Sequence, residues 1–308
     1  MNDVIEASER QAAAKRSTLV SVVVNLLLTG LQVAAGLIFG SQGLIADGIH
    51  SLSDLLADFV VLVANHFSGR APDEDHHYGH MRYETAASLV LGILLVVVGV
   101  GILWSSIGKL QHPERIAQVH ILALWVALGA LAAKEALFRY MLAVGLRVGS
   151  TMLVANAWHA RSDAASSLVV GVGIVGNLLG LPLFDPIAAL VVGIMIGRMG
   201  WSFSWQALSD LMDRSASEEQ HALIREALTA TPGVLGFHDL RSRKMGDQIL
   251  LDVHLEVRED LSVREGHDIT VEARRRIREV VPVLNVMTHL DPVEASRADA
   301  GLGYSASE

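Results

Sequence analysis

Long apolar runs separated by short breaks fill the first two thirds of the chain. A membrane-spanning helix needs about 20 mainly apolar residues. Breaks that contain glycine or proline, such as GSQG at 40–43 and LGLPLFDP at 179–186, interrupt the apolar pattern. The runs that are long enough lie at 17–39, 43–66, 84–108, 119–145, 150–180 and 186–206. The pattern therefore predicts an all-α transmembrane domain of six helices over residues 17–210, preceded by a polar arm at 1–16.

After residue 210 the pattern becomes that of a water-soluble domain. ILLDVHLEV at 249–257 alternates with a period of two, which predicts a strand, and VREGHDITVEARRRIREVV at 263–281 has helical spacing. Residues 295–308 contain too few apolar side chains for a packed core, so they are predicted to form a flexible tail. The prediction for 211–294 is a small α+β domain, with helices at 217–231 and 263–281 and strands at 234–243, 248–257 and 283–290.

The composition agrees with a membrane part joined to a soluble part. Of the 308 residues, 51% are hydrophobic, and the mean hydropathy is +0.41. The net charge of −9 argues against nucleic acid as a partner, and the lack of cysteine excludes disulfides and thiolate metal sites. The first apolar run has no small-residue cleavage site behind it, so it is predicted to be a retained helix rather than a signal peptide.

The distribution of basic residues predicts the orientation of the helices. An even number of spans places both termini on one side of the membrane. Basic residues lie on that side at Lys15, Arg16, Arg70, Arg82, Arg139 and Arg147, against Lys109 and Arg115 on the other. Because basic loops tend to stay in the cytoplasm, we expect a multi-pass membrane protein with both termini cytoplasmic.

Two of the apolar runs contain the same polar motif. The second has His50-x-x-x-Asp54 and the fifth has His159-x-x-x-Asp163. Residues four apart lie on one face of a helix, one turn from each other. Two such pairs offer two nitrogen and two oxygen ligands, which is the number and chemistry that tetrahedral Zn²⁺ accepts.

Further polar residues extend both motifs along the same helix faces. Asp47 precedes the first pair and Asn156 the second at helical spacing. A plain alternative is that these side chains only join helices through hydrogen bonds. A charged side chain at the centre of a membrane costs on the order of 2.5–3.5 kcal/mol, however, and commonly marks an ion pathway. The paired motifs therefore favour a metal pathway.

The loop after the second apolar run, PDEDHHYGHMRYE, contains a second cluster of metal-ligand residue types. It comprises Asp73, Asp75, His76, His77 and His80. Carboxylates alone would indicate a solvated turn, but three histidines among them favour metal binding.

The soluble part contains a third set of candidate ligands. They are His238, His254, His267 and His289, with Asp291 following the last histidine. Any one of them suits an ordinary surface or packed histidine. Spacing alone leaves that interpretation and a shared metal cluster equally open.

These motifs together resemble the cation diffusion facilitator family of divalent-metal transporters, and look most like its bacterial zinc and iron efflux branch. The resemblance rests on HSLSD, PDEDHHYGH, HARSD and the PGVLGFHDLR, HLEV and HLDP segments of the soluble part, and it extends from about residue 17 to 293. It implies a homodimer in a bacterial inner membrane, with six spans per subunit and a cytoplasmic ferredoxin-like domain. It also implies proton-coupled export of a divalent metal, so the protein is expected to be a secondary transporter and not an enzyme.

The resemblance also assigns roles to individual residues. The transport site would fall on His50, Asp54, His159 and Asp163. The loop site would fall on Asp73, His76 and His80, with Asp75 as a further oxygen nearby. The cytoplasmic site would use His238, His254, His267, His289 and Asp291. An ion pair near the dimer interface would map to Arg82 and Asp213.

The identity of the metal follows less directly. Many bacterial members have Asp where this chain has His50, and the His-Asp/His-Asp set resembles the zinc-selective members more closely. Zn²⁺ is therefore the expected substrate and regulatory ligand, with Fe²⁺, Cd²⁺ or Mn²⁺ as alternatives within the family. Metal binding requires neutral imidazole and ionised carboxylate, so protons compete with the metal for the same lone pairs.

Two other classes of protein place such residues in a membrane. An intramembrane metalloprotease would need a motif such as H-E-x-x-H, which the sequence lacks. A metal sensor that does not transport would suit the soluble histidines, but it would leave the intramembrane motifs without a purpose.

Overall fold

The computed structural model describes residues 7–68, 70–116, 118–148, 151–246 and 248–294. Within them the chain forms two compact units, one comprising residues up to Val63 with Ser88–Ser204, and the other comprising Ala64–Ala87 with the residues from Trp205 onward. The predicted tail at 295–308 and residues 1–6 of the predicted arm lie outside the described residues.

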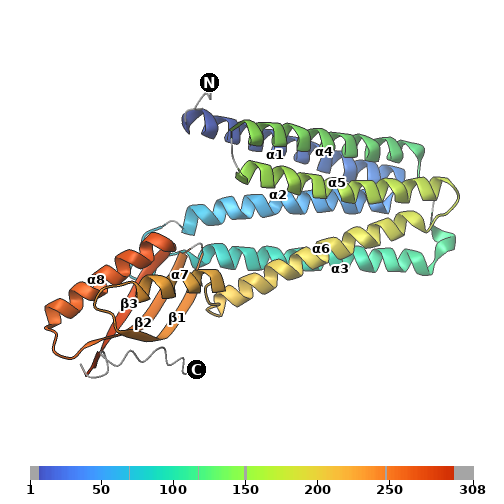
Figure 1. Ribbon diagram of the computed structural model, residues 1–308. Helices are drawn as coiled ribbons and strands as arrows, with labels where there is room; N and C mark the ends of the chain where they lie inside the picture. The colour runs from blue at the N-terminus through green and yellow to red at the C-terminus, as the bar shows by residue number, and fades with distance from the viewer. Residues whose placement is uncertain (1–6, 69, 117, 149–150, 247, 295–308) are drawn as a thin grey trace. The chain divides into compact units, whose positions relative to one another are not determined.

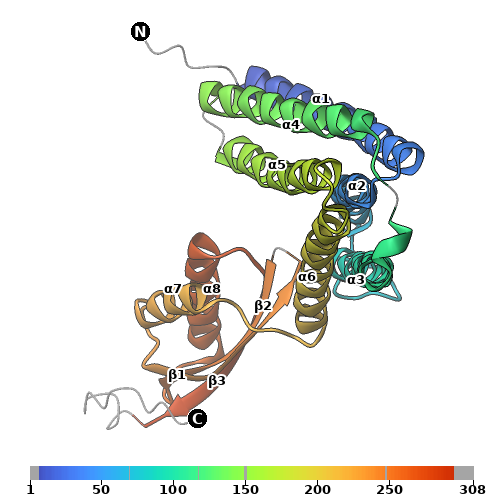
Figure 2. The same cartoon turned by 90° about the vertical axis from the view of Figure 1, so that its right-hand side faces the viewer.

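The predicted membrane domain is confirmed as all-α (Figures 1 and 2). Each of the six predicted apolar runs corresponds to one long helix, although the run at 119–145 begins two residues before its helix and the run at 150–180 ends two residues after its helix. The first helix starts ten residues before its apolar run, and so includes much of the predicted polar arm. The helices are α1 (Ala7–Phe39), α2 (Gln42–Ser68), α3 (Arg82–Gln111), α4 (Ile121–Val148), α5 (Thr151–Leu178) and α6 (Phe184–Leu211).

Helices α2 and α5 differ from the others in apolar character. Among the described helices, four are long and apolar enough to cross a membrane, namely α3, α4, α6 and the Arg16–Phe39 part of α1. Helices α2 and α5 have 27 and 28 residues, which is also sufficient length. They carry the two His-x-x-x-Asp motifs, and their polar residues lower the hydropathy.

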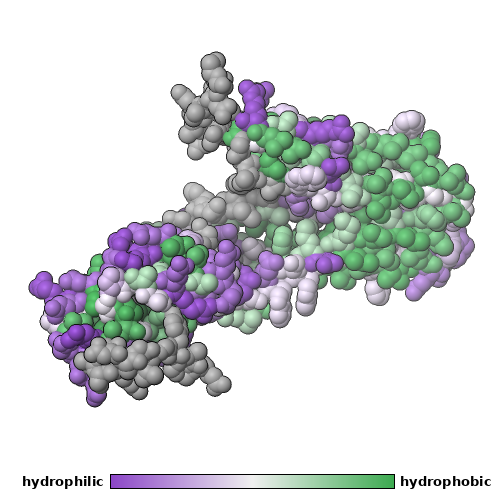
Figure 3. All heavy atoms as spheres, in the orientation of Figure 1, coloured by the Kyte–Doolittle hydropathy of each residue, from purple (hydrophilic) through white to green (hydrophobic). Residues whose placement is uncertain are grey.

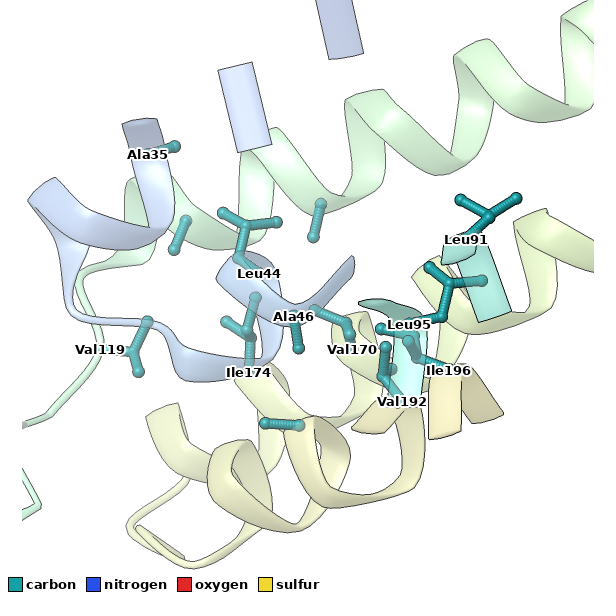
Figure 4. Packing of buried hydrophobic residues seen from close by; sticks show 13 residues of the cluster. Ala35, Leu44, Ala46, Leu91, Leu95, Val119, Val170, Ile174, Val192 and Ile196 are labelled. Atoms are coloured by element: carbon teal, nitrogen blue, oxygen red, sulfur yellow. The ribbon is translucent and has the colours of Figure 1, made fainter. Parts of the chain in front are cut away.

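The helical unit has a buried core to which all six helices contribute (Figure 4). Leu44 of α2, Leu95 of α3 and Ile174 of α5 are completely buried in it. Large apolar side chains also remain exposed, among them Trp104 and Trp125. Figure 3 shows hydrophobic side chains over much of the visible face of this unit. An apolar surface around an apolar core is expected of helices that face lipid.

Helices α3 and α6 approach each other closely because glycines line the contact. A Cβ on Gly99 would lie 2.7 Å from the backbone nitrogen of Gly197, and one on Gly200 would lie 2.7 Å from the carbonyl oxygen of Gly92. Small residues let helix backbones pack closely in lipid, where packing rather than the hydrophobic effect drives association.

The start of α2 is held against α6 by a buried carboxylate. Asp185 accepts hydrogen bonds from the Ser41 hydroxyl at 2.6 Å and from the Gln42 backbone N–H at 2.7 Å. The Ser41 hydroxyl oxygen in turn accepts from the Leu44 N–H at 3.1 Å, as an N-cap residue does. These bonds satisfy helix-terminal N–H groups and fix where α2, which carries the first His-x-x-x-Asp motif, begins.

The predicted α+β domain is also confirmed. Its sheet has the order β1-β2-β3, with β1 and β2 antiparallel and β2 and β3 parallel. Both helices pack on one face of the sheet, where they share a core with alternate residues of β2 (Figure 2). The elements are α7 (Glu218–Thr229), β1 (Gly236–Met245), β2 (Gln248–Arg258), α8 (Val263–Val280) and β3 (Val283–Val293).

Candidate metal centres

The intramembrane candidates come together on facing sides of α2 and α5. His50, Asp54 and Asp163 each offer a ligand atom, and these atoms all lie within 4.8 Å of one another. His50 is 6% exposed, and its Nδ1 has no hydrogen-bond partner among the described residues. A buried polar atom without a partner is costly, and a metal ion would supply one. This set is therefore suited chemically to hold a cation.

The fourth predicted ligand stands beside this group rather than in it. His159 Nε2 lies 4.0 Å from Asp163 Oδ2, and its side chain is 61% exposed. Asn156, one turn earlier on α5, is also exposed. The structure thus brings three of the four predicted ligands together and leaves His159 next to them.

Asp47 lies in the same region but has a different role. It is completely buried and accepts four hydrogen bonds, from Gln32, Lys134, Ser166 and Ser167. A carboxylate surrounded in this way has no lone pair pointing freely toward a metal. Lys134, which is 3% exposed, was missed in the sequence analysis. The signal was available, because a lysine in the middle of the fourth apolar run is unusual.

The loop cluster is compact and belongs to the second unit. Asp73 Oδ1 lies 3.2 Å from His76 Nδ1, and Asp73 Oδ2 lies 3.2 Å from His80 Nε2. Asp75 contributes its backbone N–H, which donates to Asp73 Oδ1 at 3.1 Å. Ligand atoms of Asp73, His76 and His80 all lie within 4.8 Å of one another, whereas Asp75 does not join this group.

The carboxyl group of Asp73 is poised to be ionised. Partial desolvation acts to raise its pKa, but hydrogen bonds from the His76 backbone and ring, with the nearby His80, outweigh it and the pKa is lowered. Metal ligation requires an ionised carboxylate. The carboxylate of Asp73 is therefore available as a metal ligand at neutral pH.

Strand register assembles the third cluster. His238 pairs with His254 across β1 and β2, and His254 pairs with His289 across β2 and β3. The three histidines thus form a row across the sheet, with ring centroids 5.1 and 4.7 Å apart. Because successive side chains of a strand point to opposite faces, the row lies on the face away from α7 and α8.

The carboxylate of Asp291 contacts all three histidines of the row. Its Oδ2 lies 3.0 Å from His254 Nδ1 and 3.2 Å from His238 Nε2, while its Oδ1 lies 3.4 Å from His289 Nε2. Two groups have ligand atoms within 4.8 Å of one another: His238, Asp239 and His254, and then His254, His289 and Asp291. Each group could hold one cation, and the two groups share His254.

One residue of this cluster was missed and one predicted ligand lies elsewhere. Asp239 follows His238 directly, and its φ of 49° turns the chain at that point. An acidic residue directly after a candidate histidine was the signal in the sequence that could have identified Asp239. His267 is exposed on α8, which covers the opposite face of the sheet, so the fold of this chain does not bring it to the histidine row.

The predicted ion pair is present within the second unit. The guanidinium of Arg82 contacts Asp213 Oδ1 and also donates to the carbonyl oxygen of Leu211 at 3.3 Å. Arg243 Nη1 lies 3.6 Å from Asp213 Oδ2. The guanidinium groups of Arg82 and Arg243 therefore both contact Asp213. Asp213 has a left-handed backbone conformation, with a φ of 61°.

Comparison with protein families covers nearly the whole chain. A family model described as the cation efflux transmembrane domain matches residues 18–212. A second, described as the cation efflux protein cytoplasmic domain, matches residues 216–293.

Two individual relatives agree with these family models. The chain is 37% identical to metal tolerance protein C1 of Arabidopsis thaliana over 85% of its own length and 60% of that relative. It is 30% identical to the manganese efflux system protein MneS of Bacillus subtilis, over 94% of this chain and 99% of MneS. A solved structure, the metal-bound C-terminal domain of the CzcD transporter from Thermotoga maritima, is 25% identical over 24% of this chain and 87% of that one, with a TM-score of 0.24.

Proposed function

Because the chain belongs to the cation diffusion facilitator family of metal-cation efflux transporters, we propose that it exports Zn²⁺ across a bacterial inner membrane in exchange for protons. In this proposal it works as a homodimer with both termini in the cytoplasm. The observation that carries it is the group of His50, Asp54 and Asp163 inside the helical unit.

The donor atoms of this group favour zinc over harder cations. Imidazole nitrogen suits Zn²⁺, whereas Mn²⁺ prefers carboxylate and other oxygen ligands. The set of His50, Asp54, His159 and Asp163 offers two imidazole nitrogens and two carboxylate oxygens, which fits a tetrahedral Zn²⁺ ion. MneS is named for manganese efflux, so Mn²⁺ is the alternative substrate to test.

Exchange for protons follows from the chemistry of the ligands. Imidazole and carboxylate bind metal only after losing a proton, so proton and metal compete for the same atoms. On the side with the lower pH, protons displace the ion from the site. The helices need only expose the site to one side at a time for this competition to drive export.

The other two clusters would bind metal without conducting it. We propose that Asp73, His76 and His80 form an accessory site, and that the histidine row of the soluble domain senses cytoplasmic metal. The Arg82–Asp213 ion pair would hold its part of the subunit in place near the partner subunit.

Proteoliposomes test the transport proposal. Zn²⁺, Mn²⁺, Cd²⁺ and Fe²⁺ uptake would be compared under an imposed pH gradient. Asp54→Ala and Asp163→Ala should each reduce Zn²⁺ flux to background. Ser162→Ala changes an exposed residue of α5 next to Asp163 and should retain the flux. Flux near the wild-type level in either aspartate variant would refute the site. Metal binding without any flux in the wild type would instead favour a non-transporting sensor.

A further inference from the structure

A buried ion pair lies beside the candidate transport site and is not part of its ligand set. Asp47 of α2 is 0% exposed and Lys134 of α4 is 3% exposed. Lys134 Nζ lies 3.4 Å from Asp47 Oδ1 and donates to the Ser167 hydroxyl at 2.8 Å. Neither residue belongs to a described group of metal-ligand atoms.

The ammonium group of Lys134 also reaches the transport site itself. Its Nζ lies 3.4 Å from the backbone carbonyl oxygen of Asp163. Lys134, Asp54 and Asp163 line one small cavity of about 10 Å³, together with Asn25 and Ser51. Lys134 therefore lies beside the candidate ligands as well as against Asp47.

A second basic residue near the candidate site, Arg161 of α5, makes different contacts. Arg161 is two residues from both His159 and Asp163, and so lies on a different face of the helix. Its guanidinium stacks over the rings of Phe138 and Trp158, at 4.8 and 5.3 Å from their centroids. Lys134, unlike Arg161, lines the cavity shared with the ligand carboxylates.

The hydrogen bonds to Asp47 show that the pair is firmly held. Its Oδ2 accepts from Gln32 at 2.5 Å and from Ser167 at 2.6 Å, and its Oδ1 accepts from Ser166 at 2.6 Å. The donors come from α1 and α5, and the ion pair joins α2 to α4. Buried charges in this setting need a partner, because an unpaired one is strongly destabilising.

Resting on the proposed function, we propose that the Asp47–Lys134 pair sets the net charge of the transport site, and thereby its affinity for a divalent cation, without ligating it. Lys134 cancels the charge of Asp47, so that Asp54 and Asp163 leave a net charge of −2. One divalent cation neutralises this charge.

Charge variants separate this role from simple helix packing. Asp47→Asn leaves Lys134 uncompensated next to the site and should weaken Zn²⁺ binding by at least about tenfold, since a unit charge a few ångströms from a divalent ion is worth more than that even at a high effective dielectric constant. Lys134→Gln should have the opposite effect, with tighter binding and slower turnover. The double variant restores the net charge and should bind within about threefold of the wild type.

Binding would be measured on the purified full-length protein by competition with a chromogenic zinc chelator. All variants would carry Asp73→Ala and Asp291→Ala, so that the intramembrane site dominates the signal. The KM and maximal rate of Zn²⁺ uptake into proteoliposomes would be measured in parallel. Lys109→Gln, which removes a lysine from the last turn of α3, is the control and should change neither quantity.

The outcomes are distinct. Opposite shifts in the two single variants, with recovery in the double variant, support the proposal. If Asp47→Asn fails to fold, tighter binding in Lys134→Gln with recovery in the double variant gives the same support. Unchanged affinity in the single variants, or a double variant as impaired as the worse single one, would overturn it. A wild type that neither binds nor transports Zn²⁺ would refute the proposed function itself.

Discussion

His254 occupies the centre of the histidine row. Its removal should reduce the stabilisation of the domain by Zn²⁺ about twice as much as removal of His289. It belongs to both groups of ligand atoms, whereas His289 belongs to one. In the isolated domain, residues 211–294, His254→Ala should therefore weaken two cation positions and His289→Ala only one. The domain has its own core of α7, α8 and β2 side chains, so we expect it to fold without metal.

The size of the effect follows from linkage. An ion that binds only the folded state stabilises it by about 2.7 kcal/mol at a free concentration 100 times its dissociation constant. Two ions that each bind at that saturation would give about twice that value. In a domain of this length, 1 kcal/mol corresponds to roughly 4–8 °C in melting temperature, so each ion should raise it by roughly 10–20 °C.

Thermal unfolding with and without Zn²⁺ measures this gain for each variant. Only the difference between the two melts is compared, because removal of a histidine also alters the metal-free domain. His289→Ala should keep about half of the wild-type gain and His254→Ala almost none. The control is His267→Ala, on the other face of the sheet, which should keep all of it. Equal losses in His254→Ala and His289→Ala would refute two sites that share His254.

Three further predictions concern other parts of the molecule. His50→Asp replaces nitrogen with a harder oxygen, so competition assays should show a smaller preference for Zn²⁺ over Cd²⁺ and Mn²⁺, and unchanged ratios would exclude His50 as a ligand. Gly200→Ala places a Cβ 2.7 Å from an α3 carbonyl oxygen and should destabilise the purified protein by about 1–3 kcal/mol, unlike Gly101→Ala, whose Cβ meets nothing within 4 Å. Hydrogen bonds led by that from Arg275 lower the pKa of Glu272 from 4.5 to about 2, so its stabilisation is complete above the unfolded value and is lost as pH falls toward 2. Urea unfolding of the domain at pH 6 and pH 3 should therefore show a smaller acid loss in Glu272→Gln than in the wild type.

The helices and the ligand motifs were predictable because each depends on local spacing. The length of the apolar run at 84–108 is enough to locate α3. A spacing of four residues is enough to place His50 and Asp54 on one side of α2. The strand at 248–257 was predictable from its alternation in the same way.

Features that depend on pairing between distant segments were not predictable. The row of histidines arises from the register of β1 with β2 and of β2 with β3, which the sequence of one strand does not contain. Lys134 lies in an apolar run whose pattern indicates only a helix. Its significance comes from Asp47, 87 residues earlier, and from a packing of helices that spacing does not specify.

Asp47 and His50 lie one turn apart on α2, but their side chains differ in how far their hydrogen-bonding capacity is satisfied. Asp47 accepts hydrogen bonds from side chains of α1 and α5 and from the Lys134 ammonium of α4. His50, one turn away on the same helix, keeps a buried Nδ1 without a hydrogen bond in the described structure. Satisfying Nδ1 with a protein donor would stabilise the empty site, but that bond would then have to break before a metal could bind. In the proposed transport site the unsatisfied nitrogen would therefore make cation binding more favourable, while the hydrogen bonds of Asp47 join α1, α2, α4 and α5 whether or not an ion is bound.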